Sequence, residues 1–125
     1  MLDSPQDKFY RQRKFDESLR EAIDATLTSM GEPVKNTVYF MLESNLNIPK
    51  NEIPNHIEDF AALLYKTFGL GAALFEIKCM HHLYSKINVD FQQITEDKLS
   101  LSKWITEGIT FEQYVCSARN NYCNP

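Results

Sequence analysis

The chain has 125 residues, of which 43% are hydrophobic, 24% charged and 12% aromatic. This composition is typical of a globular protein and excludes disordered, collagen-like and disulfide-scaffold chains. Four Gly and five Pro are too few for a loop-rich or all-β chain, and the net charge of −4 argues against general attraction to nucleic acid or anionic lipid. The length fits one domain over residues 1–125.

The sequence carries no sign of export or of a membrane span. Its start, MLDSPQDKFYRQRKFDE, has no apolar core of the kind found in secretory signals. The longest apolar run, FGLGAALFEI, is far shorter than the roughly 20 residues that cross a bilayer. Three cysteines, an odd number, favour reduced thiols. We therefore expect a cytoplasmic protein that does not bind membranes.

Apolar residues recur at threes and fours along most of the chain, which is the spacing of amphipathic helices. No segment alternates convincingly between apolar and polar residues, so strands are not expected. We expect a loop over 47–54, a capping box formed by Asn55 and Glu58, and a cap on the last helix at Thr110. The expected helices are 4–30, 32–46, 55–68, 71–87, 102–108 and 110–122. These elements predict an all-α fold, a bundle of about four helices with a C-terminal helical hairpin over 95–125.

Residues 31–87 carry a pattern of glycines and apolar positions. It comprises Gly31 and Val34, the pair Tyr39 and Phe40, Leu42 and Glu43, Phe68 and Gly69, Gly71 and Ala72, Glu76, and Leu83 with Tyr84. With this pattern the segment resembles the archaeal Nitrosopumilus output domain family. The resemblance implies a helical module of archaeal signalling or regulation, with no enzymatic role for its residues.

A metal site is a possible interpretation of the histidines and cysteines. Cys79 and His82 are three residues apart and would lie close together on one helix. A structural zinc ion needs four ligands, and Cys116 and Cys123 have the wrong spacing for a C-x-x-C motif. We therefore predict no metal, with Cys79 buried and with His81 and His82 on a solvated flank.

Glu76 is predicted to lie on the buried face of its helix. A buried carboxylate must be paired, hydrogen-bonded or protonated. It could act as a general base or switch group, but we favour a structural carboxylate that accepts a hydrogen bond from Tyr39, Tyr65 or a loop backbone. The sequence has no glycine-rich phosphate loop and no G-x-S-x-G or H-E-x-x-H motif, so we predict neither an enzyme nor a bound cofactor.

A basic extension occupies residues 1–14. Its cations interleave with aromatic residues, as in many nucleic-acid-binding arms, although several acids flank them. A nucleic-acid-associated regulator is therefore the alternative hypothesis, against the simpler interpretation of a solvated helix face. The candidate residues are Lys8, Arg11, Arg13 and Lys14.

Four apolar residues fall outside the main helical stripes and predict one exposed patch. Such a patch needs a cover, which could be the C-terminal hairpin, a second copy of the chain or another protein. Our main hypothesis is a non-enzymatic protein-interaction or dimerisation module that uses this patch and the N-terminal helix. The patch residues are Phe40, Leu63, Leu74 and Phe75.

Overall fold

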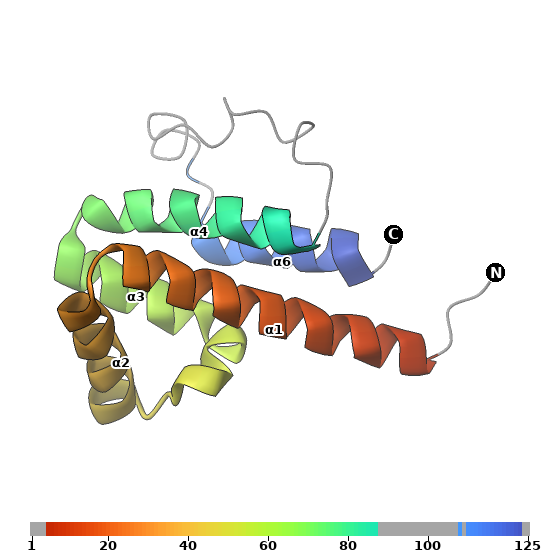
Figure 1. The fold of residues 1–125 in the computed structure, drawn as a ribbon, viewed down its shortest axis with the longest axis horizontal. Helices are drawn as coiled ribbons and strands as arrows, with labels where there is room; N and C mark the ends of the chain where they lie inside the picture. The colour runs from red at the N-terminus through yellow and green to blue at the C-terminus, as the bar shows by residue number, and fades with distance from the viewer. Residues whose placement is uncertain (1–4, 88–107, 109, 124–125) are drawn as a thin grey trace.

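The computed structural model describes residues 5–87, 108 and 110–123, with the side chains of 5–7 left out (Figure 1). Within these ranges the chain forms helices and no strand, so the all-α prediction is confirmed. None of these helices is both long enough and apolar enough to cross a membrane. The elements are α1 (Pro5–Ser29), α2 (Glu32–Leu46), the 3-10 helix η1 (Lys50–Asn55), α3 (Ile57–Phe68), α4 (Gly71–Ile87) and α6 (Phe111–Cys123).

The boundaries of α2 follow from two residues with positive φ. Gly31, between α1 and α2, has a φ of 113°, which a residue with a side chain rarely adopts. Asn47 ends α2 in the left-handed region with a φ of 54°. Its backbone N–H donates to the Glu43 carbonyl at 3.2 Å, and that of Ile48 donates to the Leu42 carbonyl at 3.0 Å. This arrangement satisfies carbonyls at the end of the helix that would otherwise have no partner.

Two of the predicted caps have different outcomes. The predicted capping box at Asn55 and Glu58 was wrong. The 3-10 helix η1 forms within the predicted loop and continues through Asn55, so Asn55 does not begin α3. The residue before α3 is His56, whose side chain makes no cap hydrogen bond. The cap at Thr110 is confirmed. Its hydroxyl accepts from the Gln113 N–H at 3.1 Å, and the Gln113 side chain accepts from the Thr110 N–H at 2.9 Å. This reciprocal pair is a capping box.

The core lies between α1 and α4, which run along each other; α6 packs on both of them, and α3 packs on α4 and α6 (Figure 1). α2 and η1 pack on α1 and α3. α4 is the most buried helix, as expected, and its residues at the core are Ala72, Ala73, Phe75, Glu76, Ile77, Cys79, Met80, Leu83, Tyr84 and Ile87.

The last helix docks on the bundle, as predicted for the C-terminal region. Phe111, Val115 and Ala118 of α6 are buried in the same core as α1 and α4. The ring of Tyr122 lies 6.2 Å from that of Phe15, measured between centroids. The other helix of the predicted hairpin, 102–108, lies almost wholly outside the described residues.

Candidate functional site

Residues 8–14 of α1, which we call the N-terminal segment, place no buried side chain in the core. Six of their seven side chains are exposed and the seventh, Arg11, is half-buried. Phe9 and Tyr10 keep 67% and 60% of their surface exposed, and the first buried side chain after this segment is Phe15. In Figure 1 this end of α1 extends past the ends of α4 and α6.

The four cations of the N-terminal segment do not share one face of the helix. At 3.6 residues per turn, Lys8 and Arg11 are about 60° apart, whereas Lys8 and Arg13 are about 140° apart. A hollow of about 470 Å³ follows the outer face of α1, and its lining mixes Arg13 and Lys14 with carboxylates. The segment therefore lacks the uniformly positive face that a phosphate backbone requires.

The predicted apolar patch was wrong as a single surface. Phe40 and Leu74 are exposed, at 70% and 49%. Phe75 is only 2% exposed, and its ring meets Phe60 of α3 edge-on at 5.8 Å; Leu63 is half-buried against the core. α4 packs on three helices, α1, α3 and α6, so its buried arc is wider than one stripe and includes Phe75.

Glu76 is buried, as predicted, with 1% of its surface exposed. The hydroxyl of Tyr65 donates a hydrogen bond to Glu76 Oε1 at 3.2 Å. Burial, followed by the nearby negative charge of Glu76, raises the pKa of Tyr65. Tyr39, the other expected partner, instead donates to Asp24. Of the two expected tyrosine partners of Glu76, the structure therefore places Tyr65 on the carboxylate.

The cysteines and histidines are spread over the fold. Cys79 and Cys123 are buried and Cys116 is exposed, and all three are free thiols. Burial raises the pKa of both buried thiols, which keeps them protonated and poorly nucleophilic at neutral pH. His82 is exposed and His81 half-buried. The described ranges contain no group of three or more His, Cys, Asp or Glu side chains that could hold a metal.

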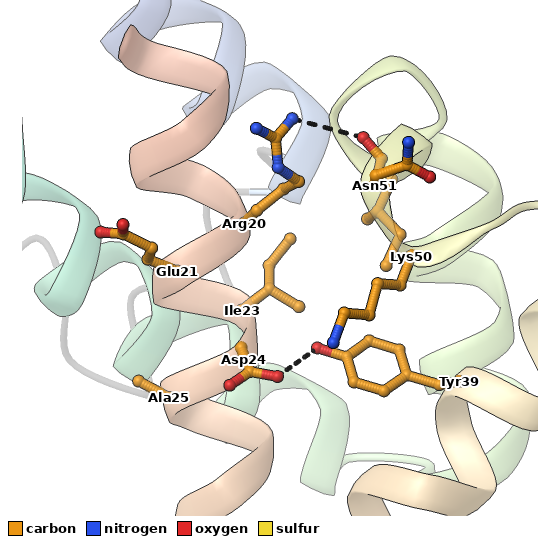
Figure 2. A pocket seen from close by; sticks show the side chains of 9 residues that line it. Arg20, Glu21, Ile23, Asp24, Ala25, Tyr39, Lys50 and Asn51 are labelled. Carbon is orange, nitrogen blue, oxygen red and sulfur yellow. Dashed lines mark hydrogen bonds between the residues drawn. The ribbon is translucent and has the colours of Figure 1, made fainter.

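A cleft of about 350 Å³ opens between α1, α2 and η1 (Figure 2). Its volume lies at the lower end of the roughly 300–1,000 Å³ typical of small-molecule sites. Polar side chains on both walls surround an apolar base. The lining residues are Arg20, Glu21, Ile23, Asp24, Ala25, Tyr39, Lys50, Asn51 and Ile53.

Hydrogen bonds hold the walls of this cleft together. Tyr39 of α2 donates to Asp24 of α1 at 2.9 Å, and Arg20 donates to the backbone carbonyl of Asn51 at 3.3 Å. The ammonium of Lys50 lies 5.3 Å from the centroid of the Tyr39 ring, within cation–π range. Burial, followed by the bond to Asp24, raises the pKa of Tyr39, so its hydroxyl remains a donor.

Sequence reasoning did not single out this cleft, because its residues come from three elements whose docking no local pattern predicts. The available signal was the spacing of Arg20 and Asp24, four residues apart on one face of α1. Lys50 lay in the expected loop. No family model, no curated protein and no solved structure matches the chain.

Proposed function

We propose that the protein is a non-enzymatic helical module that acts by binding another protein, with the N-terminal segment as its contact surface. The observation that carries this proposal is that residues 8–14 are helical and yet bury no side chain in their own fold. The resemblance of residues 31–87 to the archaeal output domain family supports a role in signalling or regulation.

The aromatic side chains favour a protein interface over a plain solvated helix. Phe9 and Tyr10 are adjacent and both mostly exposed. Aromatic residues and Arg are enriched in interfaces, where each large ring can bury roughly 150–250 Å². A helical segment that buries no side chain gains little stability from packing, so a partner that covers it also stabilises its conformation.

The charges of the segment indicate the chemistry of the partner. Four cations surround the two aromatic rings. A complementary partner surface has an apolar groove for the rings and acidic residues around it. The alternative, nucleic acid bound by Lys8, Arg11, Arg13 and Lys14, uses the same segment, but those cations are spread around the helix and the chain has a net charge of −4.

A photo-cross-linking experiment tests the proposal. The photoreactive residue p-benzoylphenylalanine replaces Tyr10 in one version of the full chain and Phe40 in another. Phe40 is a matched control because it is at least as exposed as Tyr10, at 70% against 60%, but lies on α2. We expect the version labelled at position 10 to cross-link in its host cells to one protein, or to a second copy of the chain, that position 40 does not capture.

Binding measurements with the purified cross-linked protein complete the test. Replacing both Phe9 and Tyr10 by Ala should weaken binding by about 100-fold, the scale of losing two interface anchors, whereas Phe40→Ala should leave it unchanged. Equal affinity of the double variant and the wild type contradicts the proposal. Cross-linked products that nuclease removes, with affinity falling steeply as salt rises, assign the segment to nucleic acid instead.

A further inference from the structure

The charges in the cleft between α1, α2 and η1 are unevenly compensated. Its two carboxylates are engaged: Asp24 accepts from Tyr39, and Glu21 pairs with Lys86 of α4 at 3.1 Å. Figure 2 shows Glu21 directed away from the cleft. Neither cation of the cleft, Arg20 or Lys50, forms an ion pair with a carboxylate among the described residues. Asp24 keeps its negative charge while it accepts from the neutral Tyr39 hydroxyl, so Arg20 and Lys50 leave the cleft with an excess of one positive charge.

Both cations are held in place and retain free donor capacity. Arg20 uses one N–H group on the Asn51 carbonyl, a neutral acceptor, and its guanidinium has further N–H groups to offer. The Lys50 ammonium is positioned over the Tyr39 ring and has three donors. Charge-assisted bonds from such groups to a carboxylate or phosphate are about twice as strong as neutral ones.

The apolar lining of the cleft determines what kind of body a ligand must carry besides its anionic group. Ile23 and Ile53 close the base and are almost fully buried, so the apolar surface open to a ligand comes from the half-buried Tyr39 ring and Ala25. A fully hydrated anion gains nothing from these surfaces, whereas an apolar or aromatic body displaces water from them. The volume of about 350 Å³ limits the ligand to a small molecule.

We infer that this cleft binds a small organic anion, a carboxylate or a phosphate monoester with an apolar body, between Arg20 and Lys50. The site is separate from the N-terminal segment and needs no protein partner. Its ligand class also differs, so the inference does not depend on the proposed function. A ligand here would contact α1, α2 and η1 together and stabilise their docking.

The test is a titration of the full chain, followed by amide NMR shifts, with four small probes. Benzoate and phenyl phosphate supply the two anionic groups, and benzyl alcohol and benzylamine are their neutral and cationic relatives. We expect the anions to bind in a saturable manner and to shift the amides of Arg20, Tyr39 and Asn51. Whichever anion binds with the higher affinity indicates whether the natural ligand carries a carboxylate or a phosphate.

Charge-removing variants locate the site. Lys50→Gln and Arg20→Gln should each weaken anion binding by about ten-fold, the effect of losing one charge-assisted bond. Lys78→Gln, which removes the same charge from an exposed position on α4, should change nothing. Because Lys50 is exposed, its replacement leaves the fold intact. Anion binding should also survive replacement of Phe9 and Tyr10 by Ala, which separates this test from that of the N-terminal segment.

Three results overturn the inference. The first is the absence of saturable binding by either anion. The second is equal affinity for benzyl alcohol and benzoate, since that assigns all binding to the apolar lining. The third is wild-type affinity in Lys50→Gln and Arg20→Gln, since the anion then binds elsewhere.

Discussion

The two parts of α1 differ sharply, although they belong to one continuous helix. Residues 8–14 bury no side chain, whereas the part from 15 to 27 buries seven, which are Phe15, Ser18, Leu19, Ala22, Ile23, Thr26 and Leu27. Both parts are rich in helix-forming residues, so local propensity does not distinguish them. The burial of side chains does distinguish them, because every side chain that 8–27 buries lies in the second part.

The junction between these parts lies where the end of α6 reaches α1. Arg119 of α6 donates to Asp16 at 3.1 Å and to the Pro54 carbonyl at 3.2 Å, and its guanidinium lies 5.2 Å from the centroid of the Phe15 ring. One side chain thus joins α6, α1 and η1. Residues 8–14, before this junction, bury no side chain, whereas the residues after it pack in the core of the bundle.

The largest expected effect comes from comparing two phenylalanines on α1. Phe15→Ala should lower the free energy of unfolding by about 3–5 kcal/mol, because it leaves a cavity in the core. Phe9→Ala removes the same side chain from an exposed position and should change the free energy of unfolding by less than about 0.5 kcal/mol. Urea denaturation of both variants measures the difference. Similar losses would mean that the N-terminal segment is part of the cooperative fold.

The next effect concerns the junction. Arg119→Gln should lower the free energy of unfolding by about 1–2 kcal/mol, because it removes charge-assisted bonds at a half-buried site. Lys86→Gln breaks the more exposed pair with Glu21 and should cost less than about 1 kcal/mol. Thermal denaturation of Arg119→Gln and Lys86→Gln at low and high salt measures the loss of stability in each variant. If Arg119→Gln is no worse than Lys86→Gln, Arg119 does not stabilise the docking of α6.

A smaller effect concerns the contact between Tyr39 and the buried part of α1. Tyr39→Phe removes the hydroxyl that donates to Asp24 and should lower the free energy of unfolding by about 1 kcal/mol at neutral pH. Its measurement is urea denaturation at a series of pH values. Tyr84 supplies a second titrating phenol on α4, since burial, followed by its neighbour Tyr114, raises the pKa of Tyr84 to about 12.

The sign of the pH dependence follows from the raised pKa of Tyr39. In the unfolded chain this phenol ionises near its ordinary value of 10.0, while the folded chain still holds the proton. Unfolding then releases a proton, so stability falls as the pH rises above that value. Tyr39→Phe should reduce this fall and Tyr84→Phe should reduce it separately. An unchanged alkaline slope in Tyr39→Phe would show that its hydroxyl is equally accessible in both states.

The sequence predicted helices best where a glycine lies at one end of a long apolar stripe. α4 begins at Gly71 and ends at Ile87 as expected, and α3 ends before Gly69. A periodic stripe reports local structure directly, and glycine is the residue that best tolerates the positive φ found at Gly69. The start of α3 was harder to predict, since the chain continues η1 through Asn55 and does not use that residue as a cap.

Sites were less predictable than helices, for a physical reason. A stripe indicates which side of a helix is apolar but not how many neighbours the helix has. Phe75 lies off the stripe and is still buried against Phe60, because α3 covers that side of α4. The cleft was even less predictable from the sequence, because Arg20, Tyr39 and Lys50 come together only after α1, α2 and η1 have docked. Glu76 was predictable because it lies within the stripe itself.

A pair of glycine substitutions is the most direct test of the difference within α1. Gln12→Gly and Ala22→Gly introduce the same residue into the two parts of one helix. Ala22→Gly should lower the free energy of unfolding by about 2 kcal/mol, because helix propensity and a buried methyl group are both lost. Gln12→Gly should lower the free energy of unfolding by less than about 0.5 kcal/mol, because a segment that buries no side chain frays independently of global unfolding.

Hydrogen exchange gives the same comparison without relying on small differences in stability. In the wild type, amides of the N-terminal segment should exchange through local fraying, and those near Ala22 only through global opening. Gln12→Gly should therefore speed exchange in the segment alone, whereas Ala22→Gly should speed it throughout the bundle. If Gln12→Gly also accelerates exchange near Ala22, the segment contributes to the cooperative unit. Its exposed aromatic residues would then need an explanation within the fold, and the strongest support for a partner at this end of α1 would be lost.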